Sequence, residues 1–363
     1  MFLCRLGSLN SLEQLKGTAS LERLLGSAMP SADSVGRIFN LVDPNSIRAS
    51  IRQLYLCLKR NKVLKAPWHG MVALVIDGHE SHSSYLRHCD GCLERVRSDD
   101  PDRPQYYHRN VTAQLVFAGF RFLLDAESQR LCEGELGCAK RLLDRVLKNY
   151  SRAFDVVVMD AIYANSIIFN KLIANNKYAI AVLKENAEPK LTISKLVVAE
   201  EPPTCNFEKG GVQINCWDFN REWLLIHQKV RVIATQEKPA PIKRQRDGNI
   251  EELPISSWFW LTTIPPEKAS SQAVVEIAHS RWSIENEGFN ELVNQWHADH
   301  VYKHASNAIL TFWLMSMVAS NVFRVFFTRN LKTSARIGKP MQHFARIMTA
   351  DLYATPILAG VPP

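Results

Sequence analysis

Two apolar runs constrain the fold of this chain most strongly. Met71–Ile76 and Phe154–Met159 consist mainly of apolar residues, and each ends directly before an aspartate, Asp77 or Asp160. Apolar runs without alternation are typical of strands that are covered on both faces. The runs therefore predict a layered α/β fold in which both aspartates lie at strand ends, where such folds build their sites.

The segments around these runs predict a mixed sheet flanked by helices. Residues 135–150 and 165–175 have helical periodicity, whereas residues 111–124, around a glycine, and 178–183 are typical of strands. Residues 78–110 are rich in Ser, Asp, Arg, His and Pro and predict a loop. From Ser271 a helix is expected to run toward Trp296.

The 363 residues are enough for several structural units. Residues 1–68 predict a small helical domain with a basic face that binds DNA. Residues 69–184 and 255–331 form the expected α/β core, and 185–254, with its strand-like runs, predict a β-rich insertion between the two halves. Residues 332–363 are a tail that the pattern leaves unassigned.

The charge is basic and unevenly distributed. The chain has 44 Lys and Arg against 36 Asp and Glu, a formal net charge of +8. Residues 1–70 hold ten basic and four acidic residues, which accounts for +6 of this excess. The distribution favours a polyanionic partner. Candidate DNA contacts are Arg48 and Arg52 on the N-terminal helices and Lys243 and Arg244 in the insertion, with a solvated surface as the alternative for each.

Cysteine usage and hydropathy bear on the compartment. Eight cysteines in a chain of this length favour reduced thiols in a cytoplasm over a disulfide scaffold. The apolar stretch from Ala308 to Phe327 is interrupted by Asn321 and Arg324, so a buried core helix is expected there rather than a membrane span.

A third carboxylate completes a candidate catalytic set. Glu285 lies four residues after Arg281, so both share one face of the expected helix. Asp77, Asp160 and Glu285 together could hold two Mg²⁺ or Mn²⁺ ions for phosphoryl transfer. The alternatives are a turn role for each aspartate and a surface ion pair for Arg281 and Glu285. Glu287 is a rival to Glu285, although it lacks the arginine partner.

The sequence around these residues resembles a known family. The blocks that carry the resemblance are Ile76–Glu80, Ser83–Tyr85 with His88–Cys92, Val158–Ala161, Ala181–Glu185, Arg281–Asn290 and His297–His300. In them the chain resembles the DDE transposases of bacterial insertion sequences, in the branch with a β insertion before the catalytic glutamate. The resemblance implies a ribonuclease-H-like core in which Asp77, Asp160 and Glu285 bind metal, and Arg281 contacts a DNA phosphate.

The expected function follows from this resemblance. It implies a transposase that hydrolyses phosphodiester bonds at the ends of its element and transfers the freed strand into target double-stranded DNA. It further implies a homodimer in a synaptic complex, located in a bacterial cytoplasm with the nucleoid. A structure-selective nuclease on the same core, or a decayed transposase that only binds DNA, are the alternatives.

The chain departs from the family pattern at two positions. The family has a tyrosine three residues before the arginine and a lysine seven residues after the glutamate, where this chain has Ala278 and Leu292. Lys184 is a candidate replacement for the lysine in DNA binding. Further candidates for that replacement are Asn294, Gln295 and His297.

Other polar and aromatic residues have weaker patterns. His79 and Glu80 flank Asp77 and could orient it, or form a polar turn. Trp296 could stack on an unpaired base, with core packing as the alternative. Cys89 and Cys92 have the spacing of a zinc-binding pair, with His82 and His88 nearby. A second pair would have to be Cys132 and Cys138, and a reduced loop is favoured over zinc.

Overall fold

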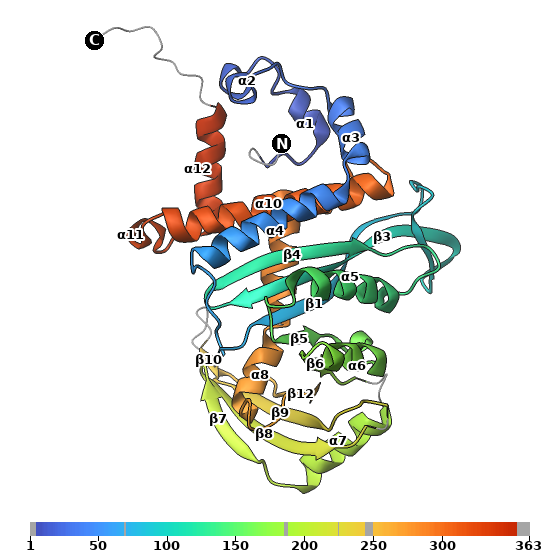
Figure 1. Cartoon of the computed structure of the whole chain (residues 1–363), viewed down its shortest axis with the longest axis vertical. Helices are drawn as coiled ribbons and strands as arrows, with labels where there is room; N and C mark the ends of the chain where they lie inside the picture. The colour runs from blue at the N-terminus through green and yellow to red at the C-terminus, as the bar shows by residue number, and fades with distance from the viewer. Residues whose placement is uncertain (1–4, 69, 185–187, 224, 244–249, 354–363) are drawn as a thin grey trace.

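A large twisted sheet organises the molecule. The computed structural model describes residues 5–68, 70–184, 188–223, 225–243 and 250–353. Within these ranges ten strands form one sheet in the order β2-β3-β1-β5-β6-β12-β9-β8-β7, and β4 pairs with β3. Helices cover the upper part of this sheet, and its lower part extends away from them as a curved β wing (Figure 1).

Five strands form the core. They are β1 (Ala73–Ser84), β3 (Asp100–Phe117), β4 (Phe120–Ser128), β5 (Val156–Met159) and β6 (Tyr178–Val182). β1, β3 and β4 pair antiparallel, while β5 and β6 run parallel to β1. This is the ribonuclease-H-like arrangement, so the predicted fold class is confirmed. All four residues of β5 are buried, as expected for a strand covered on both faces.

The expectation of a loop over residues 78–110 is wrong. β1 continues to Ser84, and β2 (Leu93–Arg97) and the first part of β3 pair with each other, so three antiparallel strands extend beyond the core. Antiparallel strands tolerate one solvated face, and their polar residues can then resemble a loop. An ion pair between Arg95 on β2 and Glu80 on β1, which lie on either side of β3, stabilises this arm.

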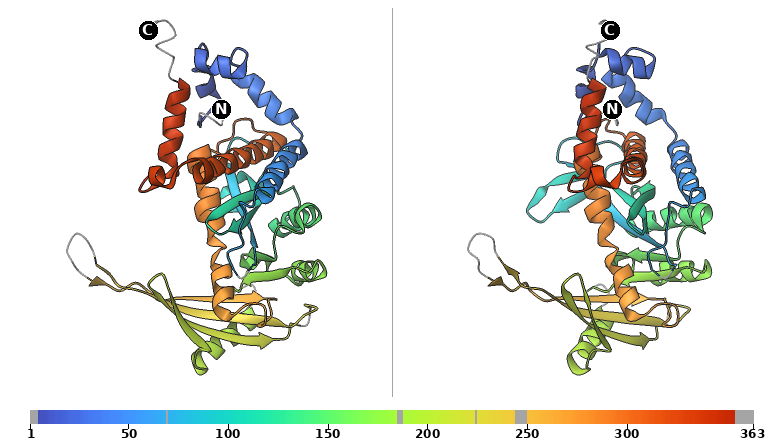
Figure 2. Two further views of the ribbon diagram at one scale, coloured as in Figure 1. Left: turned by 60° about the vertical axis from the view of Figure 1, so that its left-hand side comes forward. Right: turned by 90° about the vertical axis from the view of Figure 1, so that its left-hand side faces the viewer.

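The insertion continues the core sheet. After α7 (Glu188–Glu200) the chain forms β7 (Cys205–Lys209), β8 (Val212–Arg221) and β9 (Val230–Pro239), and β12 (Ser256–Thr262) connects β9 to β6. A separate two-stranded ribbon consists of β10 (Ile242–Lys243) and β11 (Ile250–Glu251). Figure 2 shows these strands as the wing at the lower end of the molecule.

Helices α5 (Glu135–Tyr150) and α6 (Ser166–Ala174) lie beside the core strands. α5 buries Leu142, Leu143 and Val146 on its sheet-facing side, as its periodicity predicts. A short 3₁₀ turn, η1 (Ala161–Tyr163), connects β5 to α6. Figure 2 shows α5 and α6 on one side of the strands and the chain from α8 to α9 on the other.

The helix expected from Ser271 toward Trp296 is interrupted. α8 (Ser271–His279) ends before Arg281, a π-helical segment η3 (Ile284–Phe289) follows, and α9 (Asn290–Trp296) completes the run. π-helical turns are rare and occur frequently at functional sites. Here the π-helical segment carries Glu285.

The remaining helices lie at the upper end of the molecule in Figure 1. At the N-terminal end are α1 (Leu9–Glu13), α2 (Ala19–Leu25), α3 (Ala32–Leu41) and α4 (Pro44–Arg60). At the C-terminal end, α10 (Ser306–Val325) is followed by a π-helical turn η4 (Phe326–Asn330), α11 (Thr333–Arg336) and α12 (Met341–Tyr353). The last two helices lie in the tail that the sequence pattern left unassigned.

The apolar helix α10 belongs to the core. The run from Ser306 to Asn330 is long and apolar enough to span a membrane, but 56% of its most apolar window is buried inside the molecule. α10 packs on β4 and on α3 and α4. Asn321 both donates to and accepts from the backbone of Leu123. This polar residue therefore fixes α10 to the sheet, as expected for a core helix.

Candidate active site

The parallel register between β1 and β5 brings two aspartates together. Ile76 is the partner of Met159 in this register, and Asp77 and Asp160 are the next residue on each strand. Adjacent strands lie about 4.8 Å apart, so the two backbones present their carboxylates side by side. The side chains are 13% and 25% exposed, respectively.

Glu285, on the π-helical segment η3, faces the same pocket as these two aspartates. Asp77, Asp160 and Glu285 line one open pocket of about 380 Å³, together with His79, Phe289 and Asn294. Glu285 is 44% exposed, whereas Arg281 beside it is only 9% exposed. The structure thus collects the three predicted carboxylates from two strands and the π-helical segment into one site.

Arg281 lies between two of the three carboxylates. Its Nη1 donates to Glu285 Oε1 at 2.7 Å and to Asp77 Oδ2 at 3.2 Å. Burial raises the pKa of Asp77 to about 7, against the opposing effect of Arg281 and with a further increase from Glu285. A single arginine therefore does not offset the cost of burying the Asp77 carboxylate.

Lys184 pairs with Asp160, the carboxylate that Arg281 does not contact directly. Its Nζ lies 3.1 Å from Asp160 Oδ1, and its side chain is 54% exposed. Burial acts to raise the pKa of Asp160, but the backbone N–H of Ala161 and the Lys184 ammonium outweigh burial and hold this pKa below its usual range. Asp160 is thus held as the carboxylate ion at the edge of the pocket.

The rival glutamate lies elsewhere. Glu287 Oε2 is 3.7 Å from Arg121 and 3.8 Å from Arg324, and Glu287 does not line the carboxylate pocket. The geometry favours Glu285 as the third carboxylate.

His79 and Glu80 have different surroundings. The His79 ring packs against both Phe289 and Trp313, with centroids 4.8 Å and 5.3 Å away, and it lines the pocket. Burial lowers the pKa of His79. Glu80 points away, since both of its oxygens accept from Arg95 at 2.7 Å. The structure therefore brings His79, but not Glu80, to the site.

Two expected DNA contacts are internal instead. Arg48 is paired with Asp125 at 3.0 Å and donates to the backbone of Ala126, with 13% of its side chain exposed. The prediction that Arg48 faces DNA is wrong, because buried carboxylates on β4 fix it. Trp296 is 5% exposed and lies under the Arg5 guanidinium. The prediction that this ring stacks on a base is likewise corrected to core packing.

The other expected DNA contacts lie in different places. Arg52 is exposed on α4. Lys243 is the last residue of β10, and Arg244 lies outside the described residues. Arg281 is 8% exposed and paired with Asp77, so it does not lie on an open DNA-binding surface.

The two departures from the family pattern are core positions. Ala278 and Leu292 are 1% and 0% exposed, so neither could place a tyrosine or lysine at the pocket without a rearrangement of the core. Of the suggested replacements for the lysine, Asn294 lines the carboxylate pocket. Gln295 and His297 line a neighbouring pocket of about 440 Å³, which also includes Asn294.

The sequence did not single out Glu135, Tyr163 and Arg109, which form hydrogen bonds next to Asp77 and Gly78. Tyr163 donates to Glu135 Oε1 at 2.6 Å, and Arg109 donates to Glu135 Oε2 at 2.9 Å. A Cβ on Gly78 would lie 2.4 Å from Glu135 Oε1, so only glycine permits this close approach beside Asp77. The glycine next to the aspartate was the available sequence signal.

A second glycine fits η3 against the sheet. A Cβ on Gly288 would lie 2.7 Å from Gln114 Oε1 on β3, and Gln114 Nε2 donates to Ser283 at 3.0 Å. Gln114 is fully buried and cannot move away easily. This packing holds η3, which carries Glu285, against β3, the strand that pairs with β1 and therefore lies next to Asp77.

Comparison with known proteins identifies a family for this chain. A family model described as the transposase DDE domain matches residues 122–322, a range that includes Asp160, Arg281 and Glu285 and begins after Asp77. No curated protein matches the chain. Among solved structures, the NurA nuclease from Sulfolobus solfataricus is similar at 13% identity and a TM-score of 0.29, over 65% of this chain and 83% of that one. That likeness is too low to carry an argument. The family model covers more than half of the chain, and the protein therefore belongs to the transposase DDE domain family.

Proposed function

We propose that the protein is a DNA transposase that hydrolyses a phosphodiester bond at each end of its element. The freed 3′ hydroxyl then attacks a phosphodiester bond of target DNA, so one bond forms as another breaks. The observation that carries this proposal is the pocket with three converging carboxylates, Asp77, Asp160 and Glu285. Membership of the transposase DDE domain family supports it.

The three carboxylates fit a pair of hard divalent cations. The described cationic partners of these carboxylates are Arg281 and Lys184, two cations against three acidic groups. Burial keeps the pKa of Asp77 raised despite Arg281. Carboxylate oxygens are the ligands that Mg²⁺ and Mn²⁺ prefer. When bound, these ions activate the attacking oxygen and stabilise the departing one. Asp77, Asp160 and Glu285 are the proposed ligands.

Arg281 and Lys184 have separate proposed roles. Arg281 holds Asp77 and Glu285 facing each other and neutralises part of their charge. Lys184 is at the exposed rim and can exchange Asp160 for a DNA phosphate next to the scissile bond. The exposure of Lys184 and the burial of Arg281 support this division.

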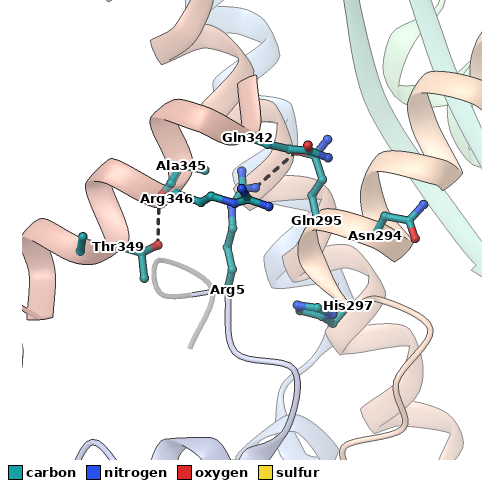
Figure 3. A pocket seen from close by; sticks show the side chains of 9 residues that line it. Arg5, Asn294, Gln295, His297, Gln342, Ala345, Arg346 and Thr349 are labelled. Atoms are coloured by element: carbon teal, nitrogen blue, oxygen red, sulfur yellow. Dashed lines mark hydrogen bonds between the residues drawn. The ribbon is translucent and has the colours of Figure 1, made fainter. Parts of the chain in front are cut away.

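The neighbouring pocket supports a path for the DNA strand. Its wall combines Arg5 from the N-terminal coil, Gln295 and His297 at the end of α9, and Arg346 from α12 (Figure 3). Arg5 Nη1 donates to Gln295 Oε1 at 3.4 Å. Because Asn294 lines both pockets, a strand leaving the carboxylates would next meet these positive and amide groups. Arg52 on α4 remains a proposed DNA contact, as do Lys243 and Arg244.

The test is a cleavage and joining assay on natural flanking DNA. A supercoiled plasmid that carries the DNA flanking this reading frame is incubated with the full chain, Mg²⁺ and a target plasmid. We expect nicks at the element ends and products joined to the target. Asp160→Ala should abolish both, whereas Asp144→Ala, at a 61% exposed position, should retain them.

The products distinguish the alternatives. Mg²⁺-dependent nicks without joined products would indicate a nuclease on the same core. Binding to the flanking DNA without cleavage in Mg²⁺ or Mn²⁺ would indicate a decayed transposase that only binds. Joined products with wild-type protein but equal activity of Asp160→Ala would contradict the proposed site. The proposed homodimer is tested by the mass of the complex with end DNA.

A further inference from the structure

Four side chains with metal-binding atoms converge away from the carboxylate pocket. They are Cys89, Cys92, His108 and His304, called here the Cys₂His₂ cluster, and their sulfur and ring nitrogen atoms all lie within 4.8 Å of one another. Cys92 is buried and Cys89 half-buried, and both are free thiols. Their Sγ atoms are 3.8 Å apart, far beyond the bond length of about 2 Å that a disulfide requires.

The spacing matches the edges of a tetrahedral zinc site. Zn–S bonds of about 2.3 Å at tetrahedral angles separate two sulfurs by about 3.8 Å, and a sulfur and an imidazole nitrogen by about 3.5 Å. The observed Sγ–Sγ distance is 3.8 Å. His108 Nε2 lies 3.4 Å from Cys89 Sγ and 3.2 Å from Cys92 Sγ, and His304 Nε2 lies 3.2 Å from Cys92 Sγ.

Backbone hydrogen bonds hold the turn between the two cysteines. The N–H of Cys92 donates to the Cys89 carbonyl at 3.0 Å, and the N–H of Cys89 points at Cys92 Sγ at 3.2 Å. Donation from backbone N–H to sulfur stabilises a thiolate ligand. A Cβ on Gly91 would lie 1.8 Å from Ser306 Oγ, so the glycine lets this turn pack directly on the first residue of α10.

The two histidines come from distant parts of the chain. His108 lies on β3, opposite His82 on β1, and His304 lies two residues before α10. Cys92 and His304 are 212 residues apart in sequence. The His82 ring packs edge-on against His304 with centroids 4.9 Å apart, which helps to orient that ligand. The cluster therefore joins the antiparallel arm to the start of the core helix α10.

We propose that the Cys₂His₂ cluster binds one structural Zn²⁺ ion. Four protein ligands close the coordination sphere and leave no open position for a substrate. Thiolate and imidazole ligands select zinc over the Mg²⁺ or Mn²⁺ that suit the carboxylate pocket. The ion fixes the arm to α10, and with it the segment 297–305 that leads away from η3 and α9. This site is independent of the proposed transposase activity.

Cys132 and Cys138, the pair that a four-cysteine zinc site would have needed, lie apart from Cys89 and Cys92. Cys132 is exposed, and the thiol of Cys138 on α5 donates to the Glu127 carbonyl at 3.3 Å. Neither belongs to the Cys₂His₂ cluster. The histidines of the cluster are His108 and His304 rather than His82 and His88, the two that lie near the cysteines in sequence. His88 stacks on Tyr106 instead.

Metal analysis of the full chain tests the proposal. Protein purified without chelators should hold about one zinc per chain by elemental analysis, and Cys92→Ser should lower this at least tenfold. Cys132→Ser removes an exposed thiol instead and should leave zinc unchanged. Asp160→Ala should also keep its zinc, which separates this site from the carboxylate pocket.

Cobalt substitution covers the case in which Cys92→Ser does not fold. Wild-type protein loaded with Co²⁺ should give the visible bands of tetrahedral cobalt together with thiolate-to-cobalt charge transfer, and added Zn²⁺ should remove both. The Cys132→Ser protein should show the same bands, because Cys132 does not belong to the Cys₂His₂ cluster. Wild-type protein without bound zinc and without these bands, or Cys92→Ser with undiminished zinc, would overturn the proposal.

Discussion

Arg281 and Asp77, 204 residues apart in sequence, share a hydrogen bond of 3.2 Å under the carboxylate pocket. The same Nη1 reaches Glu285 at 2.7 Å, so one buried guanidinium connects a core strand with the π-helical segment. This contact makes the position of Glu285 dependent on Asp77. It also places this cation beneath the carboxylates rather than on the surface.

Arg281→Gln should reduce metal-dependent nicking by about tenfold or more, with little change in binding to flanking DNA. The glutamine cannot neutralise Asp77 and Glu285, so their alignment is lost while the surface is unchanged. Nicking rates and DNA affinity are measured separately, with the exposed Arg221→Gln as the control. If binding falls and the cleavage rate of bound DNA does not, Arg281 contacts DNA instead of aligning the carboxylates.

The raised pKa of Asp77 predicts a pH-dependent stability. Between the ordinary value of 3.8 and about 7, the folded protein holds a proton that the unfolded chain has lost. The stabilising contribution of the protonated group is therefore complete below about pH 4 and is lost as pH rises through 7. In buffer free of Mg²⁺ and Mn²⁺, the unfolding free energy of wild type relative to Asp77→Asn should fall by about 1 kcal/mol or more from pH 4 to pH 8.

Urea titrations at both pH values measure this difference. Asp102→Asn, at an exposed position on β3, is the control and should show no such change relative to wild type. A wild-type stability that rises relative to Asp77→Asn over this range would mean that Asp77 is stabilised as the ion, and would contradict a pKa that burial raises.

Arg48 and Arg52 should behave in opposite ways although they lie one helical turn apart. Arg48→Ala should lower the free energy of unfolding by about 2 kcal/mol, because it leaves Asp125, 3% exposed, with Arg145 as its other partner. Arg52→Ala should change stability by less than about 0.5 kcal/mol and should weaken DNA binding in low salt. An equal loss of DNA affinity in both variants, without a loss of stability, would restore Arg48 to the DNA-binding face.

Gly288→Ala should reduce nicking while the protein stays folded. The added methyl group would meet Gln114 at 2.7 Å and push η3, with Glu285, away from β3. Gly134→Ala is a matched control, since nothing lies within 4 Å of its added Cβ and its φ is −78°. A shift of a catalytic group by a fraction of an ångström can cost about tenfold or more in rate. Equal activity of the two variants would show that the close packing of η3 is not needed.

Local patterns predicted much of the fold. Periodicity located α5 at its observed limits, Glu135–Tyr150, and the apolar runs before Asp77 and Asp160 located β1 and β5. These elements bury regular faces, and such faces leave a repeated signature in the sequence. The family resemblance is confirmed by the transposase DDE domain match, whereas the roles of Asp77, Asp160 and Glu285 remain predictions.

The sequence pattern did not predict features that depend on contacts between residues far apart in the chain. Arg48 looked like a surface cation because its partner Asp125 lies 77 residues away. The sequence did not pair Cys92 with His304, because the two residues lie 212 positions apart. The polar arm around β2 looked like a loop because its strands pair with one another rather than with a helix-covered core. In each case the partner, and not the local pattern, determines the environment.

The most direct test compares Glu285→Gln with Glu287→Gln in Mg²⁺-dependent nicking of the flanking DNA. The two positions are two residues apart in η3, but only Glu285 lines the pocket with Asp77 and Asp160. We predict that Glu285→Gln loses activity by about a hundredfold or more while Glu287→Gln stays within a few fold of wild type. Full activity of Glu285→Gln, or loss of activity only in Glu287→Gln, would contradict the assignment of this carboxylate site.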